Sequence, residues 1–548
     1  MSLFQWWKLH RASFSGLTIL YWVATIPCLS RYPFNWDAAQ FNLALHHYAV
    51  SMHQPHPPGY PLFVVLGKVL ALGLPDNVAL SLLAAIFGYS SVAVLYLFAY
   101  RLWANRWMAA LVALAWAVNP MFWLYREVAL TYTMDAAVSI SLGYLAFLTL
   151  TTRYRRYVLF GAGVLTIAGA IRPSSLVLLL PLWLFQVWYH RRNWKLWLSG
   201  LAIIGIGTLA WLIPVVWLAG GFNDYLTLSN NLYGSAADTS SVLFGASFST
   251  MWQEIYSVLL TIVSSVNLLL IPMAVGAWFL FRAYRRLWVF WCCWILPALF
   301  VFCFVHFGQN AYALIITIPL YIFLVPLGQV IAEQLEDWRR WLFAWLGIAL
   351  LAIQLVIFLG LTPGYAHPNF FPTNRAELYL QHLARWSSLV FKWNRDSIVE
   401  SDTYLAGIQQ LVEQYPADQT IVITGRDMIY PSAANGLPLR NDEVFREVSY
   451  LLPGYTTFEL APERDYYLVS DQWIMDTKHE TAVIVPNTTR YVLFVLDVIP
   501  SGMQPQGLYH TEPVNIAGTN HQIQVGVMDT PWTMGSIQFE RSADILGR

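Results

Sequence analysis

The segment NWDAAQFNLALHHYAVSMHQPHPPGYPLFVVLGK, residues 35–68, is the first strongly polar run in an otherwise apolar N-terminal half. It contains one acid, Asp37, four histidines and the proline pair Pro57 and Pro58. It directly follows an apolar stretch, residues 13–30, whose length and composition are those of a membrane crossing. The fold therefore depends on which side of a membrane this run occupies.

The composition around this segment indicates a membrane protein. Of 548 residues, 57% are apolar and 11% are charged, whereas an average soluble domain has about 25% charged residues. The 26 tryptophans suit a chain that meets many membrane interfaces, where indole rings are favoured. The formal net charge is zero, which argues against a nucleic-acid partner because phosphate binding needs an excess of Lys and Arg. Membrane lipids are the partners we expect.

Apolar runs long enough to cross a bilayer recur along residues 1–361. We predict about eleven transmembrane helices, near residues 13–30, 77–100, 107–124, 131–152, 157–171, 174–190, 196–218, 253–281, 287–305, 312–331 and 341–361. With a cytoplasmic N-terminus, most Lys and Arg fall in cytoplasmic loops, and the opposite loops up to residue 361 keep only Arg31, Lys68, Arg126 and Arg172. Positive loops stay on the cytoplasmic side, so this orientation is favoured.

The apolar run YPLFVVLGKVLALGL within residues 31–76 is an ambiguous element. Counted as a crossing, it would invert every later loop and place the arginine clusters outside. We therefore interpret residues 57–72 as a helix at the outer membrane surface, opened by Pro57 and Pro58, which suit a first helical turn. Residues 31–76 then form an external loop.

The amino-acid composition of the chain changes after residue 361. Residues 362–400 are rich in Pro and Asn and are predicted to be a linker, and 401–548 have the composition of a soluble domain. Residues 403–416 and 441–454 have helical periodicity, the latter capped by Asn441, and several short runs such as TIVITG alternate or run apolar like strands. The sequence predicts a small C-terminal α/β domain, and an odd number of crossings makes it extracytoplasmic.

Asp37 and the histidines near it admit more than one interpretation. Asp37 is either a functional acid or the N-cap of a helix over AAQFNLALHHY. A divalent metal held by histidines is the less favoured alternative, because their spacing matches no known ligand pair. Hydrogen bonding is the favoured role, with His56 shaping a pocket wall before PPGYP. No metal or other cofactor is predicted.

Three further external turns carry polar residues. Glu127 and Asp135 flank REVALTYTMD, and on one helix they would lie about 80° apart, partly facing one cavity. Side chains that extend to the membrane interface explain these two acids equally well. Arg172 is a candidate phosphate-binding residue, with an ion pair to Glu127 as the alternative. HFGQNAY, residues 306–312, adds several donors without charge, and an ordinary polar turn is its default interpretation. Under the predicted topology the following all lie at the outer helix ends: Asp37, His56, Glu127, Arg172, His306, Gln309 and Tyr312. A carboxylate and an arginine there suit a substrate with a lipid tail and a phosphate head.

Several segments of the sequence resemble those of a known family. NWDAAQFNLAL followed by HPPGYPLFVVLGK is similar to the first external loop of GT-C superfamily membrane glycosyltransferases, close to the protein O-mannosyltransferase-like group. REVALTYTMDAAV, GAGVLTIAGAIRPSSLVLLLPL and GQNAYALIITIP resemble later segments of that group, so the likeness covers about residues 13–330.

The resemblance implies sugar transfer from a polyprenyl-phosphate donor to a hydroxyl acceptor on the outer face. It implies that the acid in the first external loop, here Asp37, is catalytic. Many members have a second acid beside the first, whereas here Ala38 follows. Arg172, with His56 second, would stabilise the departing lipid phosphate, and the surface helix would exclude water. A lipid-glycan transporter or flippase is the alternative, although the two halves of the chain show no similarity of the kind expected for transporters.

Overall fold

The protein is described here by a computed structural model. The described residues are 3–284, 287–359, 393–425, 428–431, 438–441, 444–462, 466–470, 482–496, 499, 503–519 and 521–541. They form two compact units: a helical unit of residues 3–29, 57–359 and 393–397, and a second unit of residues 30–56 with the described residues from 398 onward. The predicted boundary at 361 and most of the predicted linker 362–400 lie outside the described residues.

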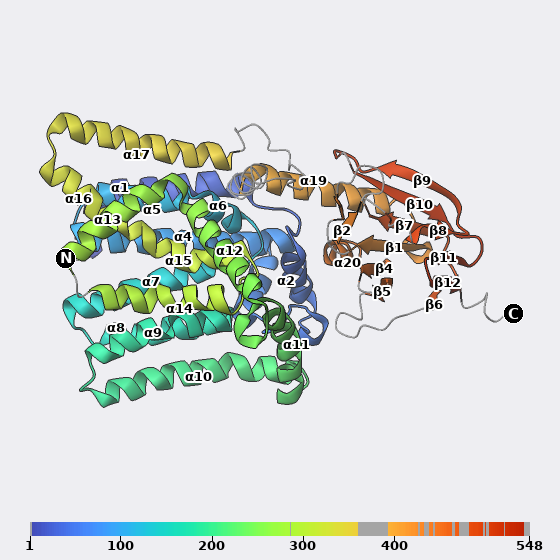
Figure 1. Ribbon diagram of the computed structural model, residues 1–548, viewed down its shortest axis with the longest axis horizontal. Coiled ribbons are helices and arrows are strands. Elements are labelled where there is room, and N and C mark those ends of the chain that lie inside the picture. The colour runs from blue at the N-terminus through green and yellow to red at the C-terminus, as the bar shows by residue number, and fades with distance from the viewer. Residues whose placement is uncertain are drawn as a thin grey trace. The chain divides into compact units, whose positions relative to one another are not determined.

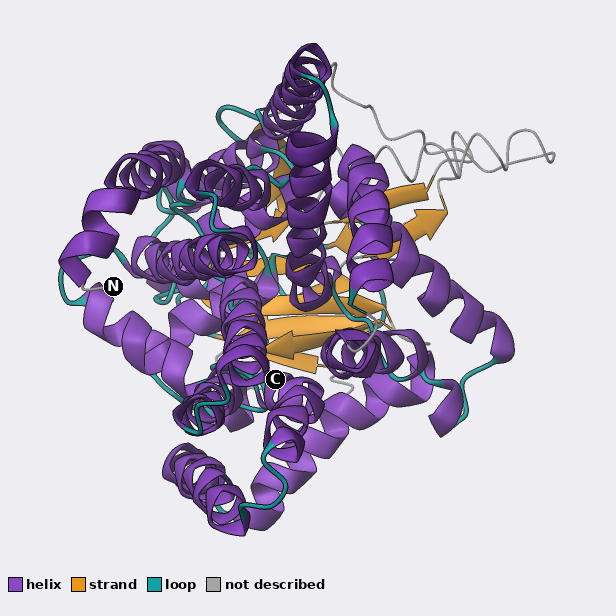
Figure 2. Ribbon diagram, turned by 90° about the vertical axis from the view of Figure 1, so that its left-hand side faces the viewer, coloured by secondary structure: helices purple, strands orange, loops and turns teal. Residues whose placement is uncertain are grey.

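The helical unit is a bundle of apolar helices. In chain order its helices are α1 (Leu3–Thr25), α3 (Pro61–Ala71), α4 (Asp76–Trp103), α5 (Arg106–Ala117), α6 (Pro120–Glu127), α7 (Tyr132–Thr152), α8 (Arg156–Ile171), α9 (Pro173–Tyr189), α10 (Trp194–Leu218), α11 (Phe222–Ser240), α12 (Phe248–Val266), α13 (Leu270–Ala283), α14 (Leu287–Phe304), α15 (Leu314–Leu320), α16 (Leu324–Gln334) and α17 (Asp337–Phe358). Short 3-10 turns join some of them, including η5 (Asn310–Ala313). Helices α4, α7, α8, α9 and α14 pack in succession and run side by side (Figure 1). Figure 2 shows many of the helices of the bundle close to end-on.

The predicted class, an α-helical polytopic membrane protein, is confirmed. Among the described residues, seven helices are long and apolar enough to cross a membrane, and the pair α5 and α6, bent by 68°, makes an eighth if counted as one span. The apolar helices α8 and α9 are shorter, with 16 and 17 residues. The total of eleven crossings stays a prediction.

Helix α3 begins later than predicted. Gly59 and Tyr60 have φ values of 103° and 45°, in the left-handed region, and a right-handed helix cannot include them. The helix therefore opens at Pro61, which occupies its first turn, and the prediction that Pro57 and Pro58 open it is wrong. With 11 residues, α3 is too short to cross a bilayer.

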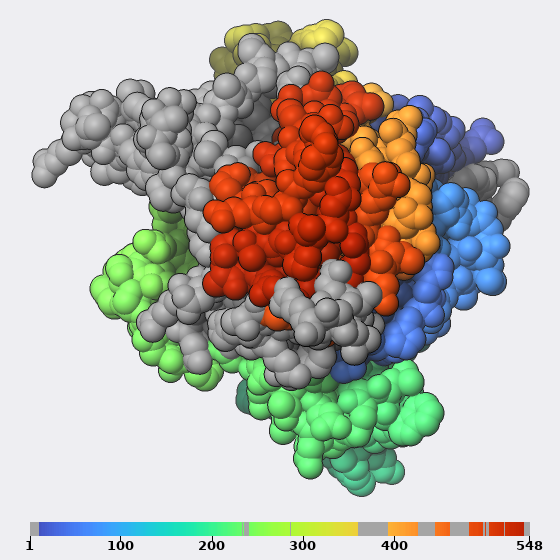
Figure 3. Space-filling view, turned by 90° about the vertical axis from the view of Figure 1, so that its right-hand side faces the viewer, coloured from blue at the N-terminus to red at the C-terminus, as the bar shows by residue number. Residues whose placement is uncertain are grey.

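The second unit contains the predicted small α/β domain. Its helices are α2 (Trp36–His46), α19 (Arg395–Val412, whose first turn belongs to the helical unit) and α20 (Phe445–Leu451). Its strands are β1 (Thr420–Gly425), β2 (Met428–Pro431), β3 (Pro438–Asn441), β4 (Thr456–Pro462), β5 (Tyr466–Ser470), β6 (Ala482–Val485), β7 (Tyr491–Val495), β8 (Pro505–Gln506), β9 (Tyr509–Asn515), β10 (Gln522–Val527), β11 (Trp532–Met534) and β12 (Ile537–Arg541). The described C-terminal segments of this unit are coloured orange to red in Figure 3.

A six-stranded mixed sheet of order β5-β4-β1-β7-β10-β9 organises this domain. Its central strand β1 is buried on both faces, with β4 and β7 parallel to it. Alternate residues point to opposite faces: Ile421 and Ile423 pack in one cluster with Trp532 of β11, which belongs to a four-stranded sheet of order β6-β12-β11-β8, whereas Val422 packs in another cluster with Leu405 of α19. Asn441 ends β3 instead of capping a helix, so the predicted start of the helix 441–454 is wrong and α20 begins at Phe445.

Candidate active site

Arg172 lies at the junction between α8 and α9. The following Pro173 disfavours a helical conformation at Arg172, which is extended with φ −151° and ψ 108°. This break directs the guanidinium to α7, where Nη1 lies 3.3 Å from Oδ2 of Asp135. The two side chains are 12% and 6% exposed. Ser175, in the first turn of α9, donates to the other carboxylate oxygen of Asp135. The ion pair therefore joins α7 to the α8–α9 junction.

Aromatic rings surround the same guanidinium. It lies 3.9 Å from the ring centroid of Tyr312 and 5.4 Å from that of Tyr132. The Tyr132 hydroxyl donates to Oε1 of Gln309 at 2.7 Å. The structure thus brings three predicted residues, Arg172, Gln309 and Tyr312, into one cluster. We call the following residues the Arg172 group: Tyr132, Asp135, Arg172, Ser175, Gln309 and Tyr312.

The turn after α14 completes this cluster. His306 is partly buried, and burial followed by the positive charge of Arg172 lowers the pKa of its imidazole, which favours the neutral ring. A Cβ at Gly308 would lie 2.5 Å from Nε2 of His306 and 3.3 Å from the Tyr312 hydroxyl. The turn approaches so closely because this position has no side chain.

Glu127 lies in different surroundings. It ends α6 and is fully buried, and Trp123 donates its indole N–H to Oε1. Nε of Arg126 lies 3.9 Å from the same oxygen. The turn at residues 128–131 separates α6 from α7, so Glu127 and Asp135 do not share a helix as assumed. The alternative in which Glu127 pairs with Arg172 is wrong, because Asp135 is the partner of Arg172.

Asp37 lies in the first turn of α2. Asn35 is the N-cap of this helix, since its side-chain oxygen accepts from the Ala38 N–H at 3.1 Å, so the interpretation of Asp37 as the cap is wrong. Oδ1 of Asp37 lies 3.6 Å from Nδ1 of His56, and these side chains are 21% and 15% exposed. The same Nδ1 donates to Oε1 of Gln40 at 2.6 Å. A partly exposed carboxylate and imidazole therefore lie side by side.

Two residues distant in sequence hold residues 30–56, which we call the Asp37 loop. Asp402 of α19 accepts from the Ser30 hydroxyl and from the backbone N–H groups of Arg31 and Tyr32, at 2.9–3.1 Å. Arg446 of α20 donates to the Met52 carbonyl at 3.2 Å. Sequence reasoning missed both anchors, because nothing local to Asp402 or Arg446 points to a partner several hundred residues away.

The histidines of this loop have different surroundings. His53 is 6% exposed, with φ 53°, and burial, followed by His56 and Arg446, lowers the pKa of its imidazole to about 3. His46 and His47 are exposed at the end of α2. Within the described part of the chain, no group of three or more His, Cys, Asp and Glu side chains is placed to hold a metal ion.

Solved structures of another protein have a similar fold. No protein-family model matches the chain. It is similar over its length to ArnT from Cupriavidus metallidurans, both bound to undecaprenyl phosphate (TM-score 0.52, 11% identity) and in the apo state (TM-score 0.51, 12% identity), with 96% of this chain and 98% of each ArnT chain covered. The chain therefore has the fold of ArnT.

One curated relative matches a short stretch. The Dictyostelium discoideum protein named Protein O-mannosyl-transferase tmem260 is 29% identical over 127 residues. This stretch is 22% of the present chain, and it spans 14% of the length of that relative.

Proposed function

We propose that this integral multi-pass membrane protein is a glycosyltransferase that transfers a sugar from a polyprenyl-phosphate donor to a hydroxyl acceptor on the extracytoplasmic face. The observation that carries the proposal is the ArnT-like fold over 96% of the chain, since one ArnT structure holds undecaprenyl phosphate. The 127-residue similarity to a protein O-mannosyl-transferase supports the same reaction class. The arginine distribution favours an outer position for the second unit.

Arg172 suits the donor phosphate. Among the described residues, Asp135 is the hydrogen-bond partner of its guanidinium, through Nη1, so the other N–H groups can bind phosphate oxygens. Asp135 and the ring of Tyr312 fix the guanidinium before the donor arrives. When the bond between sugar and phosphate breaks, the phosphate gains negative charge, and an arginine already in place stabilises that charge. Gln309 and His306 offer further hydrogen bonds to the sugar.

Asp37 suits the role of general base. A carboxylate beside the acceptor hydroxyl takes its proton as the oxygen attacks the anomeric carbon. His56 lies beside Asp37 and is oriented by Gln40, so it can help to hold the acceptor hydroxyl. Glu127 is fully buried against Arg126 and Trp123, and we assign it no part in the reaction.

The test is transfer of radiolabelled sugar from polyprenyl-phosphate sugars in membranes, with Asp37→Asn compared with the unchanged protein. We expect transfer to fall by about 10²- to 10⁴-fold, the usual contribution of a general base. Asp396→Asn is the matched control, because Asp396 is also a carboxylate in the first turn of a helix and is exposed. Equal transfer by Asp37→Asn and the control would remove Asp37 from catalysis. Absence of transfer from every donor tested would favour the flippase alternative.

A further inference from the structure

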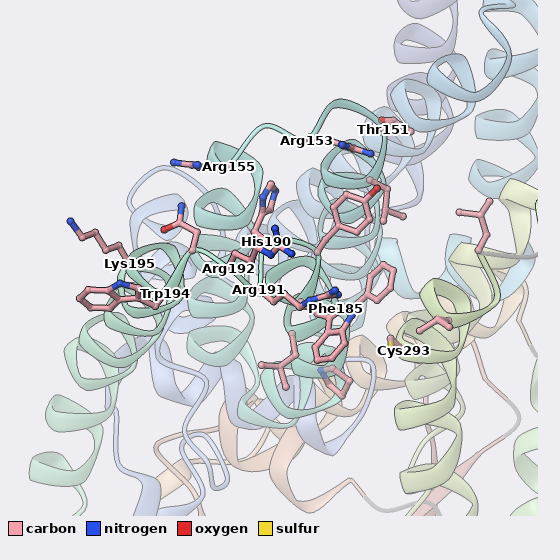
Figure 4. Close-up of a pocket in the computed structure, with 18 residues that line it drawn as sticks. Thr151, Arg153, Arg155, Phe185, His190, Arg191, Arg192, Trp194, Lys195 and Cys293 are labelled. Carbon is pink, nitrogen blue, oxygen red and sulfur yellow. The ribbon is translucent and has the colours of Figure 1, made fainter.

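A large cavity lies at the ends of α7, α9, α10 and α14 that are remote from the Arg172 group. Its volume is about 1560 Å³. Figure 4 shows its side chains arising from several neighbouring helix ends. It is lined by Leu150, Thr151, Arg153, Arg155, Pro181, Leu184, Phe185, Trp188, Tyr189, His190, Arg191, Arg192, Asn193, Trp194, Lys195, Leu287, Val289 and Cys293. We call it the basic cavity.

The basic cavity is separate from the proposed active site. Arg155 immediately precedes α8 and Arg172 immediately follows it, and α8 has 16 residues. At 1.5 Å per residue the two ends lie about 24 Å apart. Helix α7 gives the same separation, because Asp135 lies in its first turn and Thr151 in its last. The cavity and the Arg172 group therefore occupy opposite ends of the same helices.

The charge of the cavity is one-sided. Its lining includes Arg153, Arg155, Arg191, Arg192 and Lys195 but no Asp or Glu. In the described part of the chain, none of these five cations forms an ion pair with a carboxylate. Nε2 of His190 is buried there without a hydrogen-bond partner among the described residues. Such a cavity is complementary to an anion that offers several acceptor oxygens.

The walls beneath the charges are apolar. Pro181, Leu184 and Phe185 of α9 and Val289 of α14 contribute hydrocarbon surface. Trp188 and Trp194 are 59% and 64% exposed, as expected for rings at the headgroup level of a membrane. An occupant with an anionic head and a hydrocarbon tail fits this division better than a soluble anion does.

The clustering exceeds what membrane orientation requires. Under the predicted topology, Arg101, Arg106, Arg339 and Arg340 serve as positive charges on the same side, yet none of them lines the cavity. Arg339 and Arg340 pair with the neighbouring acids Glu336 and Asp337. Arg153 ends α7 with φ 59°, a conformation that glycine adopts at lower cost. The orientation of a protein in the membrane depends on how many positive charges lie on each side of the membrane. It does not require several arginines to line one cavity.

We propose that the basic cavity binds the phosphate headgroup of an anionic glycerophospholipid, with an acyl chain along the apolar surface of α9. Arg191, Arg192 and Lys195 at the junction of α9 and α10 supply the donors, and Arg153 and Arg155 add charge from the junction of α7 and α8. The bound lipid joins these two helix pairs at the end remote from Arg172. The proposal is independent of the proposed catalytic function.

The test is native mass spectrometry of the full chain purified in a neutral detergent and titrated with phosphatidylglycerol. The pocket variant is Arg191→Gln, Arg192→Gln and Lys195→Gln. The control variant removes the same charge from exposed sites outside the cavity: Arg11→Gln, Arg101→Gln and Arg282→Gln. Each surface cation contributes about fivefold to binding of an anionic lipid, so the pocket variant should bind phosphatidylglycerol roughly a hundredfold more weakly, and the control like the unchanged protein.

If the triple variant does not fold, single variants provide the test. Lys195→Gln and Arg153→Gln should each weaken binding of phosphatidylglycerol by about fivefold. Phosphatidylcholine should be bound equally weakly by all variants. Equal loss in the control variant would overturn the proposal, because net charge would then explain the binding. Displacement of phosphatidylglycerol by an equal concentration of inorganic phosphate would overturn the lipid assignment. If the protein binds undecaprenyl phosphate but not phosphatidylglycerol, and the pocket variant loses that binding, the assignment of a glycerophospholipid would be overturned.

Discussion

The Arg172 group and the Asp37 loop are held in place by different means. Arg172 and Asp135 form a buried ion pair between apolar helices, and Ser175 from the next helical turn completes it. Asp37 is carried on a short helix in a loop, and its anchors, Asp402 and Arg446, belong to α19 and α20. The first is set by helix packing, and the second by hydrogen bonds to a domain encoded at the other end of the chain.

Because of this difference, mutations in the two regions should affect stability and activity to different extents. An isolated charge inside packed helices is costly, so damage to the Arg172 group should reduce stability together with activity. Residues on a loop contribute little to the core, so damage to the Asp37 loop should reduce activity with a smaller loss of stability.

Arg172→Gln should have the largest effect within the helical unit. Loss of a donor aimed at developing charge lowers transfer by about 10²- to 10³-fold, and the unpaired Asp135 destabilises the protein by about 3–5 kcal/mol. Thermal unfolding in detergent and sugar transfer measure the two effects. Adding Asp135→Asn should restore stability and leave transfer low. Recovery of transfer in this double variant would show that Arg172 is purely structural.

Asp402→Ala should lower transfer by about tenfold. It removes three hydrogen bonds that hold one end of the loop, while Arg446 still holds the far end. Limited proteolysis within residues 30–56 should become faster. Glu400→Ala, an exposed acid on the same helix, is the control and should change neither quantity. Unchanged transfer in Asp402→Ala would mean that the anchor does not position Asp37.

The Asp37 loop should weaken in acid because His53 is buried in its neutral form. Its pKa of about 3 lies below the ordinary 6.5, so the unfolded loop binds the proton more tightly than the folded one. Stability is therefore full above pH 6.5 and falls by up to about 1.4 kcal/mol per pH unit as pH drops toward 3.

Hydrogen exchange in α2 and α20, corrected for intrinsic rates, measures this decline. His53→Asn should flatten it, because asparagine tolerates the left-handed backbone and does not titrate. The exposed His47→Asn should leave it unchanged. A decline that persists in His53→Asn would assign the effect to another group.

Gly308→Ala should have the smallest effect, lowering transfer by about three- to tenfold. The added methyl group would overlap with His306 and Tyr312. Such overpacking costs about 1–3 kcal/mol, and small shifts of the surrounding side chains would relieve part of that cost. Gly163→Ala in α8, where nothing lies within 4 Å, is the matched control and should stabilise the helix by about 0.5–1 kcal/mol. Equal transfer in both variants would place the turn outside the site.

The membrane class, the helical segments and the small C-terminal domain could be predicted from the amino-acid sequence. These properties follow from local sums, because about 20 apolar residues in succession commit a segment to the bilayer wherever it lies. Gly59 and Tyr60 have a left-handed backbone, and α3 therefore begins later than predicted. In the sequence, only the short run GYP indicates this conformation, and it does so weakly.

Which polar groups lie in contact depends on how the helices and strands pack. The tertiary structure paired Arg172 with Asp135 and left Glu127 against Arg126, although both acids flank the same turn. It also gathered Arg153, Arg155 and Arg191 into one cavity and joined the Asp37 loop to Asp402. Hydropathy is set residue by residue, whereas ion pairs and anchors depend on distances between elements far apart in the chain, and packing alone fixes those distances.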